Sequence, residues 1–150
     1  MSDLIKIAES YCKAWNNLDI HFIEDYLLVD FEYISQLVLE PIQGKEKYLV
    51  YLNRKFKSIR KSDEPVFAEL AYFNHIPCAI LIQHLNTPEK SGFSSEELSS
   101  EGILVKVPLY TIERKAIIIF KFKENKLKEA TLCVIAPANN QITRTGIFPK

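Results

Sequence analysis

The spacing of apolar residues changes partway along the chain, from the period of a helix to that of a strand. Between Leu4 and Leu18, apolar side chains recur every three or four residues, which is the stripe that an amphipathic helix buries. From residue 67 onward, branched and aromatic residues alternate with polar ones or run together, as they do in strands. Helices followed by strands indicate an α+β fold with a mostly antiparallel sheet.

Three helices are expected in the first part of the chain. The first covers residues 4–18 and ends near a pair of asparagines, whose side chains compete for backbone hydrogen bonds. Asp19 then precedes a short second helix over residues 20–26 and can accept from its free backbone amides. The third helix covers about residues 45–60, with one apolar face and one basic face.

The remaining periodic segments favour strands, and the last two are joined by a tight hairpin at Glu124-Asn125. The residues between 86 and 102 are rich in Ser, Glu and Gly, and we predict a mobile loop there, with a lid as one interpretation. The expected strands cover residues 31–39, 67–73, 78–85, 103–110, 112–123 and 126–136.

A chain of 150 residues with 47% apolar residues has room for one hydrophobic core. We expect a single domain over residues 1–137 and a polar tail over residues 138–150, ordered only if it docks on the sheet or on a partner. Basic and acidic residues balance at 19 each, so net charge favours neither nucleic acid nor an anionic membrane as a partner.

We expect neither an export signal nor a membrane span in this chain. Its first residues lack a basic segment followed by an apolar run, and no stretch approaches the roughly 20 apolar residues that a span needs. Cys12, Cys78 and Cys133 are far apart and lack metal-ligand spacing, so we expect no metal. A reduced, cytoplasmic chain is the simplest interpretation.

Four segments, taken in order, resemble the nuclear transport factor 2-like superfamily. They are the helix from Ile7 to Asn16 followed by Asp19, the strand start Asp30-Phe-Glu-Tyr, the turn Pro41-Ile-Gln-Gly-Lys before a helix, and the carboxy-terminal hairpin. This superfamily includes ketosteroid isomerases, SnoaL-like polyketide cyclases, scytalone dehydratase and many bacterial proteins without an assigned function.

The resemblance covers about residues 4–136 and implies a cone-shaped fold, in which a strongly curved sheet wraps around the third of three amino-terminal helices. It also implies a cavity between sheet and helices, and a homodimer formed through the sheet. No cofactor is implied. The chemistry is not implied either, because one fold of this kind serves isomerases, dehydratases, cyclases and adaptors.

The resemblance to ketosteroid isomerases implies a role for Tyr11, which corresponds to a tyrosine that donates to a developing oxyanion. The two aspartates of those enzymes correspond to Ser35 and Ile117, which can neither transfer a proton nor share the oxyanion. Steroid-type isomerisation is therefore not expected, and scytalone dehydratase's pairing of His and Asp has no clear counterpart either.

Tyr11 and Trp15 lie one helical turn apart on the apolar stripe, so they either line a pocket as polar donors or simply pack in the core. Glu32, beside Ser35 on the first strand, is a candidate general base or a solvated residue. His84, at the end of a strand, can titrate near neutral pH and is the third catalytic candidate.

Two more residues are candidate ligand contacts. Period two places Arg114 on the face of Ala116, Ile118 and Phe120, where it could bind a carboxylate bidentately or lie at a strand entrance in water. Cys133 alternates with its neighbours as a small core residue does. The ligand-contact candidates are thus Tyr11, Trp15, Ser35, Arg114 and Cys133.

These observations favour a protein that binds a small molecule in a pocket and lacks a demonstrable catalytic set. One alternative is a cofactor-independent isomerase, dehydratase or cyclase that uses Tyr11 with Glu32 or His84, provided that at least two of them converge on one point of the cavity. The other is a protein-interaction module that uses the sheet or the tail. The sequence does not identify the ligand.

Overall fold

Two α-helices and a seven-stranded sheet make up most of the chain that the computed structural model describes, namely residues 2–35, 40–85, 96–98, 104–106, 112–133 and 141–150. The helical elements are α1 (Ser2–Asn17), the 3₁₀ turns η1 (Ile20–Phe22) and η2 (Glu24–Tyr26), and α2 (Lys45–Lys61). The strands are β1 (Leu27–Ser35), β2 (Ile42–Gln43), β3 (Val66–Phe73), β4 (Ile76–Leu85), β5 (Glu96–Leu98), β6 (Leu104–Lys106), β7 (Ile112–Lys123), β8 (Lys126–Cys133) and β9 (Ile142–Ile147).

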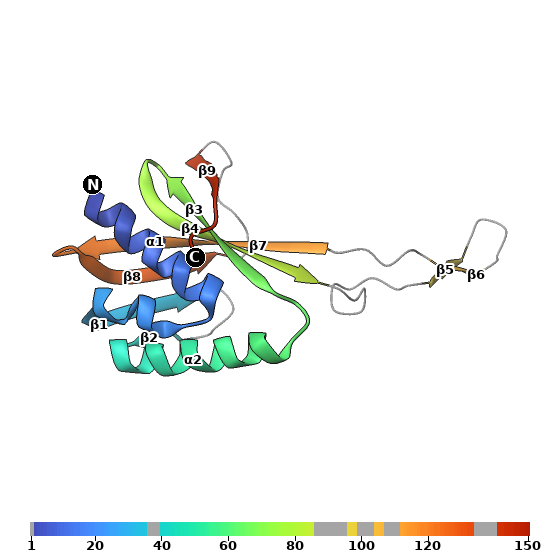
Figure 1. Cartoon of the computed structure of the whole chain (residues 1–150), viewed down its shortest axis with the longest axis horizontal. Coiled ribbons are helices and arrows are strands. Elements are labelled where there is room, and N and C mark those ends of the chain that lie inside the picture. The colour runs from blue at the N-terminus through green and yellow to red at the C-terminus, as the bar shows by residue number, and fades with distance from the viewer. Residues whose placement is uncertain (1, 36–39, 86–95, 99–103, 107–111, 134–140) are drawn as a thin grey trace.

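The large sheet has the strand order β2-β1-β8-β7-β4-β3-β9. All of its neighbouring strands are antiparallel except β1 and β8, which are parallel. Strands β5 and β6 form a separate pair that projects away from the main body (Figure 1). The expected α+β class and the mostly antiparallel sheet are confirmed.

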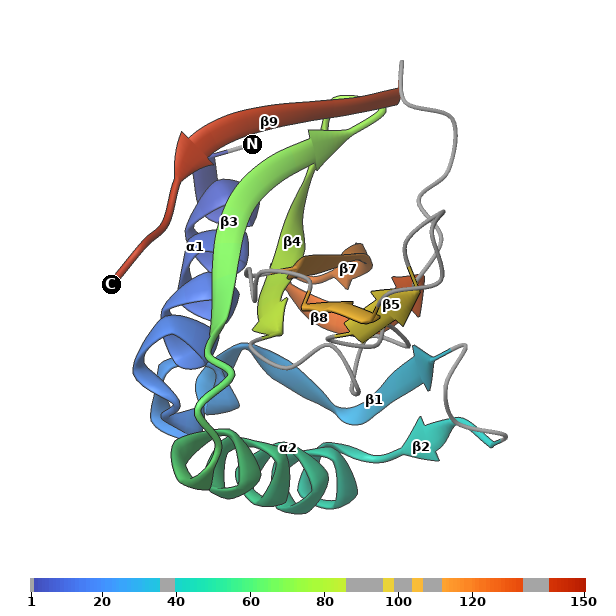
Figure 2. The same ribbon diagram turned by 90° about the vertical axis from the view of Figure 1, so that its right-hand side faces the viewer.

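Both helices contribute to one large apolar core together with β1, β3, β4, β7 and β8. In Figure 2, α1 lies along β3, and α2 runs below β1. A second, smaller apolar cluster contains no helix residue among the described ones and includes Ala71, Cys78, Ile80, Ile82 and Ile117. Because alternate residues of a strand point to opposite faces, the sheet separates the two clusters.

The structure confirms two of the three predicted helices and corrects the second. Residues 20–26 form two successive 3₁₀ turns in place of one helix. The entry to these turns is as predicted, because the Asp19 side chain accepts from the backbone N–H of His21 at 2.9 Å. Leu18, with φ +53°, reverses the chain after α1.

The hairpin between β7 and β8 is also confirmed. Glu124 and Asn125 both have positive φ, at +53° and +57°, which is the backbone of the turn type that matches the twist of two-residue hairpins. β1 begins at Leu27, four residues before the predicted start at Phe31, and its predicted end over residues 36–39 lies outside the described residues. The short strand β2 was not predicted.

The carboxy-terminal segment is part of the sheet, since β9 pairs with β3 along its edge. Its main anchor is Glu69 of β3, only 1% exposed, which accepts from Arg144 Nε at 3.1 Å and from the Gly146 backbone N–H at 2.9 Å. Asn16 of α1 adds a bond from Nδ2 to the Pro149 carbonyl at 2.6 Å. The tail thus docks on the sheet, which is one of the two conditions expected for its order.

The predicted domain boundary at residue 137 lies outside the described residues. So does most of the predicted loop or lid over residues 86–102, apart from β5.

Candidate functional site

A cavity of about 380 Å³ opens between α2 and the helix-covered face of the sheet. Its volume is at the small end of the range for ligand pockets, about 300–1,000 Å³. Five strands and both helices, with the loop after α2, supply its walls. The described lining residues are Trp15, Tyr33, Ser35, Tyr51, Lys55, Ser58, Ile59, Ser62, Glu64, Val66, Leu81, Gln83, Arg114, Lys115, Ala116 and Leu132.

Aromatic rings form one wall of this cavity. Tyr33 of β1 and Tyr51 of α2 lie with their ring centroids 5.5 Å apart and their planes tilted by 35°. Trp15 of α1 is fixed from behind by Phe56, whose ring meets the indole edge-on at 5.1 Å. These contacts hold the rings in place, so the wall is preorganised for a flat or apolar body.

Burial strongly raises the pKa of the Tyr33 hydroxyl, and the nearby Tyr11 and Tyr51 hydroxyls add to the effect. Its phenol therefore stays protonated at neutral pH and can donate a hydrogen bond. Ser35 lies two residues further on the same face of β1 and is also buried. The aromatic wall thus carries neutral hydroxyl donors.

Most of the charged residues around the cavity are basic. The lining cations are Lys55 of α2 and Arg114 and Lys115 of β7. The described lining includes one carboxylate, Glu64. Lys115 pairs with Glu113 at 3.6 Å, whereas neither Lys55 nor Arg114 takes part in an ion pair within the described part of the chain. Glu64 is buried and interacts with another group of the protein.

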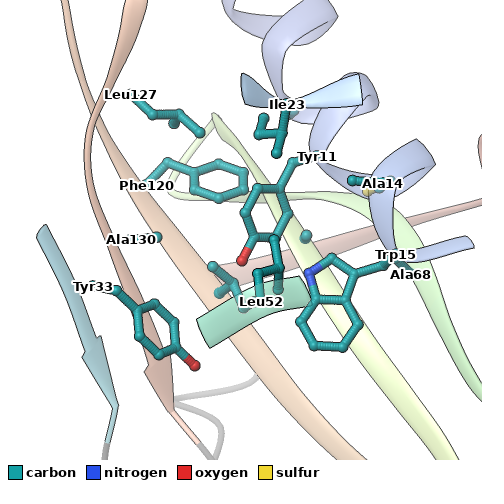
Figure 3. Packing of buried hydrophobic residues seen from close by; sticks show 14 of the residues in the cluster. Tyr11, Ala14, Trp15, Ile23, Tyr33, Leu52, Ala68, Phe120, Leu127 and Ala130 are labelled. Carbon is teal, nitrogen blue, oxygen red and sulfur yellow. The ribbon is translucent and has the colours of Figure 1, made fainter. Parts of the chain in front are cut away.

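Of the two interpretations left open for Tyr11, a polar donor in the pocket or a core residue, the structure shows the core residue. Its hydroxyl forms a 2.7 Å hydrogen bond with the hydroxyl of Tyr48, and both side chains are fully buried. Figure 3 shows the Tyr11 ring between Phe120 and Leu52, with Phe120 edge-on to it at 4.9 Å. Tyr11 is not among the described lining residues, so its hydroxyl binds Tyr48 and not a ligand in this cavity.

Trp15 does line the cavity, as predicted, and its indole nitrogen is unusual. The Nε1 atom is buried and has no hydrogen-bond partner among the described residues. It lies close enough to Tyr11 to favour the charged form of that phenol, but it makes no bond of normal geometry with it. An unpaired buried N–H costs about 1–3 kcal/mol, so an acceptor that reached it would be favoured.

The three catalytic candidates do not converge. Glu32 points away from the core face of β1, where its carboxylate accepts from Gln43 Nε2 at 3.1 Å. His84 packs edge-on against Phe67 at 5.4 Å, and neither His84 nor Glu32 is among the described residues that line the cavity. With Tyr11 in the core, no two of the three candidates meet at this cavity, which is the condition set for the acid-base alternative.

Two ligand-contact candidates, Ser35 and Arg114, lie in the cavity wall, whereas Cys133 does not. Cys133 is half-buried against the second apolar cluster, because neighbouring Leu132 takes the cavity face of β8. The expected ligand contact by Cys133 has no support from this cavity and stays a prediction.

The sequence reasoning missed the contribution of α2. The cavity is lined by Tyr51, Lys55 and Ser58 of α2 and by Ser62, which caps its end. The spacing of four and three residues between the first three marks one helical face. That face lies beside the buried stripe of the helix. Its combination of an aromatic ring, a cation and hydroxyl groups could have indicated a pocket wall.

Other kinds of site are not seen in the described residues. No three His, Cys, Asp or Glu side chains there are grouped so as to hold a metal ion. Within the same residues, no helix is both long and apolar enough to cross a membrane.

Comparison with known proteins gives structural but not sequence matches. No protein-family model matches the chain, and no curated protein matches it in sequence. A candidate polyketide cyclase from Pseudomonas putida KT2440 has 15% sequence identity and a TM-score of 0.53, with 90% of this chain and 91% of that one covered.

Two further solved structures are similar. An M. tuberculosis LEH-like epoxide hydrolase is 12% identical with a TM-score of 0.51, and the match covers 87% of this chain and 81% of that one. An NTF2-like protein of unknown function from Cytophaga hutchinsonii is 10% identical with a TM-score of 0.50, covering 85% and 96%. Two of the three carry different named activities and the third has no known function, but all three match this chain in architecture, so the chain has the fold of the nuclear transport factor 2-like proteins.

Proposed function

We propose that the protein binds a small molecule in the cavity between α2 and the sheet. The observation that carries the proposal is the cavity itself, about 380 Å³, with a fixed aromatic wall and several polar groups that converge on it. This combination of an apolar surface with a few placed polar groups is typical of ligand sites. The three catalytic candidates do not share this cavity, so we propose binding without catalysis.

The test is a thermal-shift screen of small compounds against the native chain and the variant Ala116→Phe. Ala116 lines the cavity, and a phenyl ring there would occupy part of the space. A ligand present at 100 times its dissociation constant stabilises the folded state by about 2.7 kcal/mol. For a chain of this size we expect a rise in Tm of roughly 5–10 °C.

The matched control is Lys123→Phe, which places the same ring at the exposed end of the same strand, β7. Compounds that stabilise the native chain and Lys123→Phe but not Ala116→Phe would support binding in the cavity. Equal stabilisation of all three chains would place the ligand elsewhere. A broad panel without any stabilising compound would count against the proposal.

We also propose a homodimer formed through the sheet. The exposed side chains at the end of β9, an edge strand of the sheet, support it, with Ile147 54% and Phe148 42% exposed. Light scattering on a sizing column should give twice the chain mass, reduced in Ile147→Ser with Phe148→Ser. A monomer at all tested concentrations would contradict this. The same exposed pair is the strongest support for the alternative of a protein-interaction module.

Two finer expectations stay proposals on the same basis. The cone shape is supported by the NTF2-like fold, and a crystal structure would test it. A cytoplasmic location is supported by three free cysteines, and cell fractionation would test it.

A further inference from the structure

We infer that the cavity selects a small organic anion whose charged group is bound by Arg114 and Lys55 and whose flat, apolar body lies against the aromatic wall. This inference rests on the proposed function and adds the chemical class of the ligand. It is carried by the charge of the lining, by the hydrogen-bonding character of its polar groups and by the field of α2.

The two cations come from opposite walls of the cavity. Arg114 lies on β7 and Lys55 on α2, and within the described residues neither has an ion-pair partner. An arginine guanidinium presents parallel N–H donors that match the two oxygens of a carboxylate, and an ammonium group adds a point charge. Glu64, the lining carboxylate among the described residues, carries at most one negative charge, so it cannot neutralise both cations.

The neutral polar groups of the wall are compatible with the same ligand. Tyr33 stays protonated, so its hydroxyl can donate to a ligand oxygen. The Trp15 N–H is closed off from the cavity and lies beside the Tyr11 hydroxyl, so it is not a ligand contact. A carboxylate can accept from the phenol hydroxyl as well as from the cations, so the Tyr33 hydroxyl is compatible with an anion.

Helix α2 brings a local positive field although the chain as a whole carries no net charge. Within Lys45–Lys61 one acidic residue, Glu46, stands against Lys45, Lys47, Arg54, Lys55, Lys57, Arg60 and Lys61. Such a surplus attracts anions to a neighbouring opening. The wall opposite supplies the apolar contact, with Leu81 and Leu132 beside the rings.

The test compares three probes with the same naphthalene skeleton by titration calorimetry on the full chain. The probes are 2-naphthoate, the neutral 2-naphthamide and the cationic 2-naphthylmethylamine. We expect naphthoate to bind at least about tenfold more tightly than the amide and the amine not to bind measurably, because a charge-assisted bidentate contact is lost in both.

The matched variants are Arg114→Gln, Lys55→Gln and Arg54→Gln. Each removes one positive charge from an exposed side chain, but Arg54 is not among the described lining residues. We expect Arg114→Gln to weaken naphthoate about tenfold, Lys55→Gln by a smaller factor, and Arg54→Gln by less than about twofold. Amide affinity should stay unchanged in all three variants.

Equal affinities for acid and amide, or preference for the amine, would overturn the inference while leaving a ligand pocket in place. Equal losses in Arg114→Gln and Arg54→Gln would show a general field effect and would also overturn it. If none of the three probes binds while a compound from the wider screen does, the ligand class is wrong and the proposed function stands. If the wider screen also yields no ligand, the proposed function fails as well.

Discussion

The hydroxyl pair of Tyr11 and Tyr48 provides the sharpest test of the difference between a core tyrosine and a ligand-binding tyrosine. The two oxygens are 2.7 Å apart, and both side chains are fully buried. Replacing one of them by phenylalanine leaves the other hydroxyl buried without its partner, which costs about 1–3 kcal/mol. Replacing both removes both polar groups at nearly constant shape and should cost less than the sum of the single changes.

The two single variants should not be equal. In Tyr48→Phe, the Tyr11 hydroxyl still has the unpaired N–H of Trp15 close by and can accept from it after a small shift. In Tyr11→Phe, the Tyr48 hydroxyl loses its bond to Tyr11, the partner that the structure shows for it. We therefore expect losses of about 1 kcal/mol for Tyr48→Phe, about 2 for Tyr11→Phe and about 1 for the double variant. The coupling free energy is then about 2 kcal/mol.

Urea unfolding followed by far-ultraviolet circular dichroism measures all four chains, with the dependence on urea expected to be unchanged. The single tryptophan, Trp15, gives an independent fluorescence readout next to the substituted pair. A double variant that loses the full sum of the two single losses would refute the reasoning, because it would show that the hydroxyls do not depend on each other. A tenfold loss of naphthoate affinity in Tyr11→Phe, absent from Tyr48→Phe, would refute the assignment of Tyr11 to the core.

Two further predictions concern buried titratable groups. Burial disfavours the charged form of Glu69, but its contacts with Arg144 and the β9 backbone outweigh this and lower its pKa. A lowered carboxyl pKa stabilises the fold above the unfolded-state value, about 4.3, and the effect is lost as the pH falls through the folded-state value. Glu69→Gln should therefore lower the free energy of unfolding by about 1–2 kcal/mol at pH 7, a figure kept small because Arg144 is half-exposed. In urea unfolding, the difference in stability from the native chain should shrink below about pH 4. A difference that does not change with pH would contradict this. Burial raises the thiol pKa of Cys12 and Cys78 to about 12, which disfavours their reactive thiolate forms. Timed alkylation read by mass spectrometry should therefore label the half-buried Cys133 first. Equal labelling rates for the three cysteines would contradict the burial of Cys12 and Cys78.

The elements that could be predicted from the sequence are those whose signals are local. The helices α1 and α2 and the turn at Glu124-Asn125 follow from side-chain spacing and backbone preference within a few residues. Strand β9 could not be predicted, because its sequence is polar and its anchor, Glu69, lies 75 residues from Arg144. A strand stabilised by a distant ion pair leaves no periodic signal of its own.

The difference between local and long-range signals also explains which site residues could be predicted. The helical stripe shows that Tyr11 is buried, but whether its hydroxyl meets a ligand or a side chain depends on Tyr48, 37 residues away. Period two placed Arg114 on the correct face of its strand, because alternation is a local property. For Glu32, alternation left both faces open, and the structure places the residue outside the core.

The contrast between the core and the cavity is itself an argument for function. In the core, the buried hydroxyls of Tyr11 and Tyr48 satisfy each other. At the cavity wall, by contrast, Arg114 and Lys55 have no ion pair among the described residues. Both cations are exposed to solvent, so leaving them unpaired costs little stability and keeps them available for a ligand. An anion in the cavity is the partner that would engage both cations together, as the inferred ligand class requires.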